Sequence, residues 1–154
     1  MGDVTLSIEI PALPNEVFVF FVPQRMPLWY GTEMDARFEV QGGASDFAVG
    51  QKVRISGRLA RYEMQLTVVI TAYEWERLLE WRFQDSYGVK GMQRWELQNA
   101  AGKTHVMMRD VYEMPSRFGR LLDRFFTIRG IRLRDQDWLN RLRHLAAPKE
   151  ALSS

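Results

Sequence analysis

Apolar and polar residues alternate in seven separate segments of the chain, and a period of two is typical of β-strands with one buried face. In segment 62–73, every second residue from Met64 to Ala72 is apolar. The predicted strands cover residues 4–10, 34–40, 51–60, 62–73, 78–85, 90–97 and 104–114. Because the connections between the last six are short, we expect an antiparallel meander of hairpins.

A short helical stretch follows the first predicted strand. Residues 15–22 are very apolar, and Pro14 is well placed for the first turn of a helix. Pro23 and Pro27 permit at most one more helical turn before Trp29. We therefore expect two short helices after the first strand.

The period changes to that of a helix near the end of the chain. Ser116 is a plausible N-cap, no proline follows until Pro148, and the predicted helix covers 117–147. The apolar residues at helical spacing are Phe118, Leu121, Leu122, Phe125 and Ile128, followed by Trp138, Leu139, Leu142 and Leu145.

This order of elements predicts the α+β class and a hollow interior. One face of the sheet is apolar, and only the terminal helix is large enough to cover it. A strongly twisted sheet of seven strands curls around such a helix. We expect the helix to cover part of the concave face and to leave the remainder as a cavity.

Length and composition exclude several kinds of site. The chain has 154 residues, the size of one domain, which we place at 1–148 with a tail at 149–154. It has no Cys, and its two His are His105 and His144. We therefore expect no metal site. The motifs GxGxxG, HExxH, GxSxG and the P-loop lysine are missing, so we expect no cofactor.

The apolar runs are too short for a bilayer span. The longest are 17–22 and 68–70, whereas a span needs roughly 20 residues. Residues 1–10 carry no basic start followed by an apolar stretch, so we predict no secretory signal. The expectation is a soluble, cytoplasmic chain without stable membrane insertion.

Positive charge gathers near the end of the chain. Residues 117–143 hold eight Arg against three Asp, so the segment carries +5 and the remainder −3. Such a segment could contact an anionic membrane surface or a protein partner, or it could be the solvated face of a helix. Binding to nucleic acid is not expected, and nothing in the sequence indicates an oligomeric state.

Several short motifs stand in a recognisable order. They are Ile10-Pro11-Ala12 at the end of the first strand, LPNEVFVFF at 13–21, PLWY at 27–30, QRWEL at 93–97 and WLNRLRHLA at 138–146. With the order strand, two helices, six strands and helix, the chain resembles the START-related helix-grip (SRPBCC) superfamily, in its polyketide cyclase/dehydrase branch. The resemblance covers essentially the whole chain.

The resemblance implies a helix-grip fold with a deep, mostly apolar pocket between the curved sheet and the terminal helix. It implies no particular reaction, because the superfamily contains carriers, sensors, cyclases and dehydratases.

Strand alternation identifies the residues expected to face this pocket. Trp29 and Tyr30 should lie at its mouth, and Leu122 and Phe125 should close it from the helix. The candidate ligand-binding residues are Trp29, Tyr30, Phe38, Ile55, Leu66, Val68, Trp81, Phe83, Trp95, Met108, Tyr112, Leu122 and Phe125. The alternative is that these side chains fill a solid core.

Polar residues on the inward face are the weak catalytic candidates, because burying them unpaired costs roughly 1–3 kcal/mol each. They are Asp110, Tyr112 and Gln93. Asp110 could act as a base while Tyr112 donates a hydrogen bond to a ligand carbonyl. A salt bridge is the alternative, with Arg94, Arg109 or Arg129 as the expected partner of Asp110.

Two further positions depend on register and on helix face. A slip of one residue in strand 104–114 would turn Arg109 inward and expel Asp110. Arg129 and Arg132 interrupt the apolar stripe of the terminal helix, so one of them could bind a ligand carboxylate. The alternative is a partner aspartate, since Asp135 lies three residues beyond Arg132.

Three functions fit these observations. The first is binding of a hydrophobic or aromatic small molecule, such as a lipid, a quinone or a polyketide. The second is an aromatase/cyclase or dehydratase whose few polar groups exchange protons in the same cavity. The third is an interaction protein that uses the arginine-rich helix. Because the sequence shows no strong acid–base pair, it favours binding over catalysis.

Overall fold

The computed structural model describes residues 2–115 and 128–149. Seven strands form one sheet in the order β1-β7-β6-β5-β4-β3-β2, and every neighbouring pair is antiparallel. The strands are β1 (Gly2–Ile10), β2 (Arg37–Val40), β3 (Lys52–Leu59), β4 (Tyr62–Glu74), β5 (Leu78–Asp85), β6 (Lys90–Ala100) and β7 (Lys103–Glu113). The first strand pairs with the last, and β2 stands at the opposite edge.

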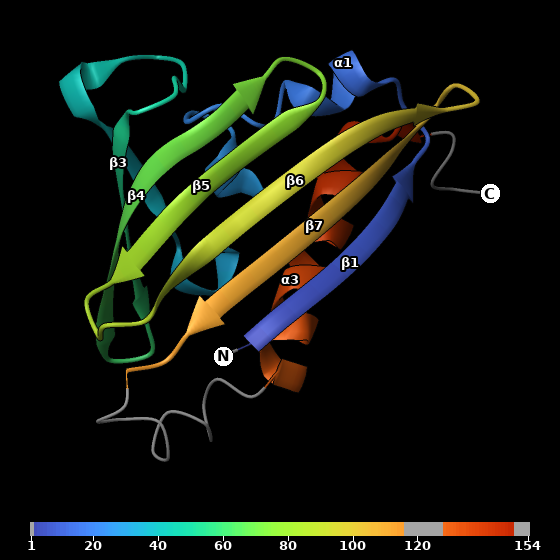
Figure 1. The fold of residues 1–154 in the computed structure, drawn as a ribbon. Helices are drawn as coiled ribbons and strands as arrows, with labels where there is room; N and C mark the ends of the chain where they lie inside the picture. Colours follow the sequence, from blue (N-terminus) through green and yellow to red (C-terminus); the bar gives the residue numbers. More distant parts are fainter. Residues whose placement is uncertain (1, 116–127, 150–154) are drawn as a thin grey trace.

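One long helix and several short ones complete the fold. They are α1 (Pro14–Phe18), the 3-10 helices η1 (Met26–Leu28), η2 (Thr32–Met34) and η3 (Gln41–Gly43), and α3 (Ile128–Ala146). Figure 1 shows α3 lying along one face of the curved sheet, where it packs against β1. The predicted α+β helix-grip architecture is confirmed.

The predicted elements differ from the observed ones mainly at helix ends. The helix expected over 15–22 begins at Pro14 and ends at Phe18. After Phe18 the backbone tightens into turns in which the N–H groups of Phe20 and Phe21 donate to the carbonyls three residues earlier, of Val17 and Phe18. Strand 34–40 is shortened to Arg37–Val40, since residues 32–34 form η2. The second half of the predicted terminal helix is α3, whereas Ser116, Phe118, Leu121, Leu122 and Phe125 lie outside the described residues.

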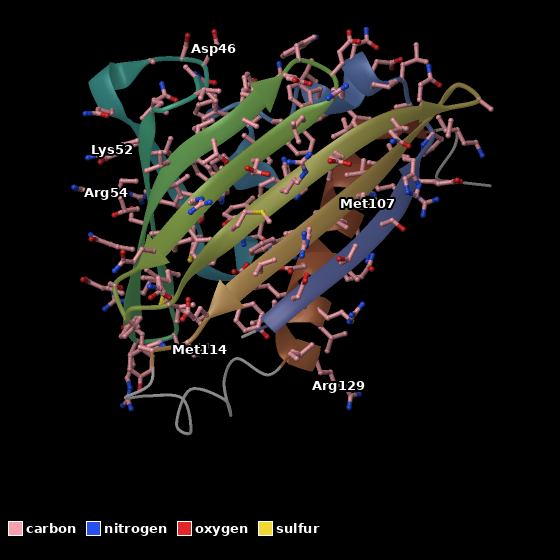
Figure 2. All side chains as sticks on the ribbon, in the orientation of Figure 1. Asp46, Lys52, Arg54, Met107, Met114 and Arg129 are labelled. Atoms are coloured by element: carbon pink, nitrogen blue, oxygen red, sulfur yellow. The ribbon has the colours of Figure 1, made fainter. Side chains whose placement is uncertain are left out.

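Alternation correctly predicts which face of each strand is buried. On β7, the residues Val106, Met108, Asp110 and Tyr112 are buried, so the strand has the predicted register and Arg109 points outward. Figure 2 shows side chains on both faces of the sheet, with Met107 labelled on the outer face, where 42% of it is exposed. On the inner face the side chains form the core.

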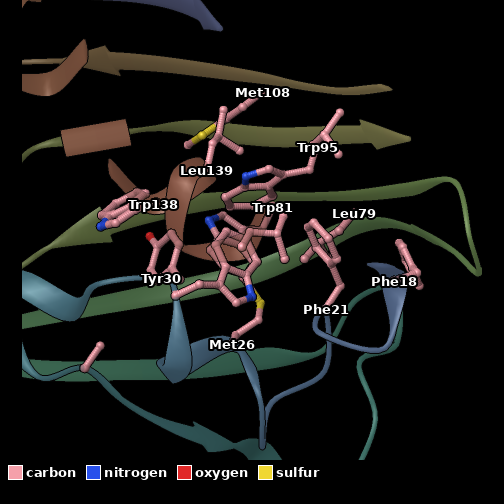
Figure 3. Close-up of a cluster of buried hydrophobic side chains, with 14 of the residues drawn as sticks. Phe18, Phe21, Met26, Tyr30, Leu79, Trp81, Trp95, Met108, Trp138 and Leu139 are labelled. Atoms are coloured by element: carbon pink, nitrogen blue, oxygen red, sulfur yellow. The ribbon is translucent and has the colours of Figure 1, made fainter. Parts of the chain in front are cut away.

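Aromatic rings fill much of this core. Trp81, Trp95 and Tyr30 pack edge to face, and Phe21 joins them from the segment after α1. Figure 3 shows this cluster, with Trp138 of α3 beside Tyr30. Much of the space under the sheet is therefore solid.

Trp29 belongs to this solid part, and its predicted position at the pocket mouth is wrong. The residue is fully buried, its ring packs on Phe21 and Trp95, and its indole N–H donates to the carbonyl of Phe20 at 2.8 Å. Trp29 directly follows η1 and lies in the core, so a position just after the short helices does not place it at the surface.

Candidate functional site

A cavity of about 180 Å³ lies between α3 and the inner face of the sheet. The strands β3 to β7 contribute one wall, η2 a second, and the first two turns of α3 with Trp138 a third. The lining residues that the sequence singled out are Tyr30, Leu66, Phe83, Gln93, Asp110 and Tyr112. The predicted hollow is therefore present, at one part of the interface.

Other predicted ligand-binding residues lie away from this cavity. Trp29, Phe38, Ile55, Val68, Trp81, Trp95 and Met108 are absent from its described lining and pack in the aromatic core or beside it. Leu122 and Phe125 lie outside the described residues. The structure thus separates one inward face into a packed part and a hollow part, which alternation does not distinguish.

The cavity also has lining residues that sequence reasoning missed. They are Glu33, Met34, Leu59, Met64, Asp85, Val89, Met114, Gly130, Ile131, Arg134 and Trp138. A signal for the α3 members exists, because Ile131, Asp135, Trp138 and Leu142 recur at intervals of three and four residues and share the buried face. In this pattern, Asp135 is a polar residue within the apolar stripe of α3, and Arg134 is its neighbour in the sequence.

A buried glutamine organises the polar side of the cavity. Oε1 of Gln93 accepts hydrogen bonds from the Tyr30 hydroxyl at 2.7 Å and from the Trp81 indole N–H at 2.9 Å. An indole nitrogen can only donate, so the amide oxygen must face it. The amide NH₂ of Gln93 therefore turns to Asp110, with Nε2 3.4 Å from Oδ2.

Asp110 forms the salt bridge expected as the alternative to catalysis, but its partner is Arg134. Nη2 of Arg134 lies 3.1 Å from Oδ2 of Asp110 and 3.2 Å from Oδ1 of Asp135. Asp110 and Asp135 are 1% and 0% exposed, so both carboxyls are removed from water.

The three arginines predicted as partners of Asp110 are placed elsewhere. Arg94 pairs with Glu80 and Glu96, and Arg109 pairs with Asp3. Arg129 is exposed at the start of α3 and points away from the sheet (Figure 2). Arg132 is exposed as well, and the pairing expected between it and Asp135 is made by Arg134 instead. The first two turns of α3 hold three arginines, and spacing alone does not show which one faces the sheet.

Arg134 is held in place by an aromatic ring as well as by two carboxyls. Its guanidinium carbon lies 4.4 Å from the centre of the Trp138 ring, which is the geometry of a cation–π contact. Trp138 in turn packs on Tyr30, with 4.3 Å between ring centres, and its indole N–H donates to Glu33 at 2.9 Å.

Burial shifts the protonation of this cluster. Burial and, to a smaller extent, the nearby Asp110 together raise the pKa of Asp135 to about 9 against the opposing attraction of Arg134. Burial likewise raises the pKa of Tyr30 well above its ordinary value. For Arg134, burial alone would lower the pKa, but the charges of Asp135 and Asp110 outweigh it and raise the pKa. At neutral pH, Asp135 therefore holds a proton beside a charged Arg134.

Comparison of the sequence with models of protein families identifies the family. The model described as polyketide cyclase / dehydrase and lipid transport matches residues 1–147. The chain belongs to this family. The chain matches none of the curated proteins with which it was compared.

Solved structures of similar fold agree with this membership. A conserved protein from Geobacillus kaustophilus superposes with a TM-score of 0.72 at 13% identity, and the match covers 94% of each chain. A protein from Chromobacterium violaceum gives a TM-score of 0.71 at 14% identity, covering 97% of this chain and 100% of that one. These identities show a shared fold.

A third structure has a description that mentions biosynthesis. DynU16, a protein in the dynemicin biosynthetic locus, gives a TM-score of 0.67 at 18% identity over 94% of this chain. The present chain spans about half the length of DynU16, since the match covers 46% of that protein.

Two structural findings bear on metals and membranes. Within residues 2–115 and 128–149, no group of three or more His, Cys, Asp or Glu side chains could hold a metal ion. The helices in the same ranges include none that is long and apolar enough to cross a membrane. Contact between the exposed arginines of α3 and an anionic surface stays a prediction.

Proposed function

We propose that this protein binds a hydrophobic or aromatic small molecule in the cavity between α3 and the sheet. The observation that carries the proposal is the cavity itself, in which apolar side chains such as Leu66, Phe83 and Ile131 surround a polar group of Tyr30 and Asp110. Apolar walls with a few convergent polar groups are typical of small-molecule sites. The family's description, which includes lipid transport, supports it.

The size of the cavity restricts the ligand. Pockets for drug-sized molecules usually measure roughly 300–1,000 Å³, whereas an apolar cavity of about 150 Å³ holds a benzene molecule. At about 180 Å³, this cavity fits a single ring or a short chain. Of the predicted ligands, a monocyclic quinone or a small polyketide-like ring is therefore favoured over a complete lipid with two acyl chains. We assign this binding to a single domain at 1–148, which corresponds closely to the span of the family match.

A cyclase or dehydratase is the second candidate, and one observation favours it. Asp135 holds a proton at neutral pH next to Asp110, so one carboxyl can donate a proton and the other can accept one. Both candidates need the cavity. They differ in the effect of Asp110→Asn, which should abolish turnover of a polyketide-like substrate while leaving most of the binding.

Filling the cavity tests the binding proposal. Leu66 lines it from β4, and a Leu66→Trp substitution would place an indole in the space. Native mass spectrometry of freshly purified protein should show a small molecule that is bound to the wild type and lost from this variant. In a titration with 2-phenylethanol, the variant should bind at least about tenfold more weakly.

Thr67→Trp is the matched control. Thr67 is the next residue on the same strand and is exposed on the outer face of the sheet, so its variant should bind as the wild type does. Melting temperatures show whether both variants are folded. A folded Leu66→Trp variant with unchanged binding would contradict the proposed function.

A further inference from the structure

The described lining of the cavity contains more carboxyl groups than cations. Glu33, Asp85 and Asp110 line it, and Arg134 is the only Lys or Arg among its described lining residues. Asp135 adds a carboxyl directly behind, bonded to the same guanidinium. Asp85 accepts backbone N–H bonds within the β5–β6 turn, and Glu33 is exposed. The imbalance is therefore most severe at the buried pair of Asp110 and Asp135.

This pair is short of one positive charge and of hydrogen-bond donors. Oδ1 of Asp110 and Oδ2 of Asp135 are buried and have no hydrogen-bond partner among the other described residues, so the proton of Asp135 can be shared only between the two carboxyls. Arg134 is bonded to the other oxygen of each carboxyl. One guanidinium can balance only one of two ionised carboxyls, and an unbalanced buried charge is strongly unfavourable.

Three kinds of cation could make up the difference. A metal ion is disfavoured, because no group of three or more suitable ligands stands together among the described residues. When no ligand is bound, the proton that Asp135 holds supplies the missing positive charge. The remaining candidate is an organic cation that enters from the cavity. Aromatic walls such as Tyr30, Phe83 and Tyr112 suit its hydrocarbon part.

We propose that the cavity selects a small aromatic amine, bound as its ammonium ion with N–H groups directed to Asp110, in front of the buried Asp135. This inference rests on the proposed function and specifies the class of ligand. The ammonium replaces the proton: Asp135 releases its proton to solvent, both carboxyls become anions, and Arg134 and the ligand supply two positive charges. A carboxylate ligand is rejected, because it would add negative charge where Arg134 already has two acidic partners.

The other groups that face the pair do not supply the released proton. Tyr30 packs above it from the segment between η1 and η2, and burial raises its pKa so that it stays neutral. Gln93 of β6 has no titratable proton. Glu33 of η2 accepts a hydrogen bond from Trp138 of α3. Proton release on binding is therefore assigned to Asp135.

Three probes that share a phenyl ring on a two-carbon chain test the proposal: 2-phenylethylamine, 2-phenylethanol and 3-phenylpropanoate. Each is titrated into the wild-type protein at pH 7 by calorimetry, in two buffers with different ionisation enthalpies. The amine should bind at least about tenfold more tightly than the alcohol, and the carboxylate should bind most weakly. The dependence on buffer should correspond to release of about one proton for each amine bound.

A pair of aspartate variants on the same helix isolates the effect. Asp135→Asn removes the exchangeable proton and one negative charge, so the amine should lose its preference and its proton release while the alcohol still binds. Asp137→Asn is the control, because Asp137 is exposed and pairs with Arg141 at the surface. Its titrations should match those of the wild type.

The outcomes separate this inference from the proposed function. Equal binding of all three probes, preference for the carboxylate, or amine binding without proton release would overturn the inference and leave the proposed function standing. If none of the probes binds, the proposed function fails along with the inference. Should Asp135→Asn not fold, the wild-type titrations alone still decide, because the proton release is measured without any substitution.

Discussion

Asp135 lies on the buried side of α3 between Ile131 and Trp138, and its proton should make stability depend on pH. Its pKa is raised to about 9 in the folded protein and is about 3.9 in an unfolded chain. Between these values the folded state binds a proton that the unfolded state has lost. The free energy of unfolding should therefore fall as pH rises from about 4 to about 9, by up to about 1.4 kcal/mol per pH unit.

Urea unfolding at pH 5 and at pH 8 measures this effect. The amide of Asp135→Asn carries no titratable proton, so this variant should lose the decline and be more stable than the wild type at pH 8. Asp137→Asn should keep the wild-type slope. A wild-type stability that does not fall between the two pH values would show that Asp135 is ionised in the folded protein.

Loss of Arg134 should lower the free energy of unfolding more than loss of an arginine at the surface of the same helix. Replacing it by Met keeps a long side chain in the cavity wall but leaves the Asp110 and Asp135 carboxyls without their cation. Removing one partner from a buried ion pair typically costs about 3–5 kcal/mol. The free energy of unfolding of Arg134→Met, measured in urea at pH 7, should fall by an amount in this range.

Arg141→Met is the matched comparison, since Arg141 is 52% exposed and pairs with the 56% exposed Asp137 on the same helix. Such surface pairs contribute under about 1 kcal/mol. Similar losses for the two variants would mean that the pair at Asp110 is solvated rather than buried.

These residues also show which parts of the site could be predicted. The register of β7 predicted that Asp110 is buried, because a period of two depends only on the strand itself. Its partner could not be predicted in the same way, because Arg129, Arg132 and Arg134 lie within five residues of one another on the terminal helix. The choice among them depends on how α3 rotates against the sheet.

Among the elements, η2 and β3 are in close contact at Gly57. A Cβ at this position would lie 2.5 Å from the backbone carbonyl oxygen of Met34 and 2.7 Å from its Cγ. The backbone of η2 cannot yield easily, so Gly57→Ala should lower the free energy of unfolding by about 1–3 kcal/mol. Because Met34 lines the cavity, binding of 2-phenylethanol should weaken as well.

Ser56→Ala provides the comparison from the neighbouring residue of β3. Its effect on stability should remain within about 0.5 kcal/mol. Chemical denaturation of both variants measures the difference. Equal stabilities would mean that η2 can move away from β3 without loss.

Strands were easier to predict than the segment between β1 and β2. The two faces of each strand in β3 to β7 can be predicted without knowing the tertiary contacts, because successive side chains point to opposite sides of the pleat. The segment from residue 11 to 36 has no such period, and its prolines only restrict local geometry. Trp29 was therefore misplaced, although the helices around it were expected.

For the whole molecule, the sheet and α3 enclose two different environments. The aromatic cluster around Trp81 and Trp95 is packed, whereas the space between Leu66, Asp110 and Trp138 is hollow. Order and spacing of elements predicted that a helix covers a curved sheet. They did not predict how far the cavity extends, because its volume depends on how single side chains such as Trp29 and Tyr30 fill the interior.

The bonding of Asp110, Arg134 and Asp135 also has a consequence for how this interior changes over generations. With one proton, the trio is electrically neutral, and replacing Arg134 or Asp110 alone leaves a buried charge without its counterpart. Viable lineages should therefore exchange these two positions together, whereas Asp135 can be converted to its amide by itself. Among descendants of this chain, Asp110 and Arg134 should be inherited or lost as a pair.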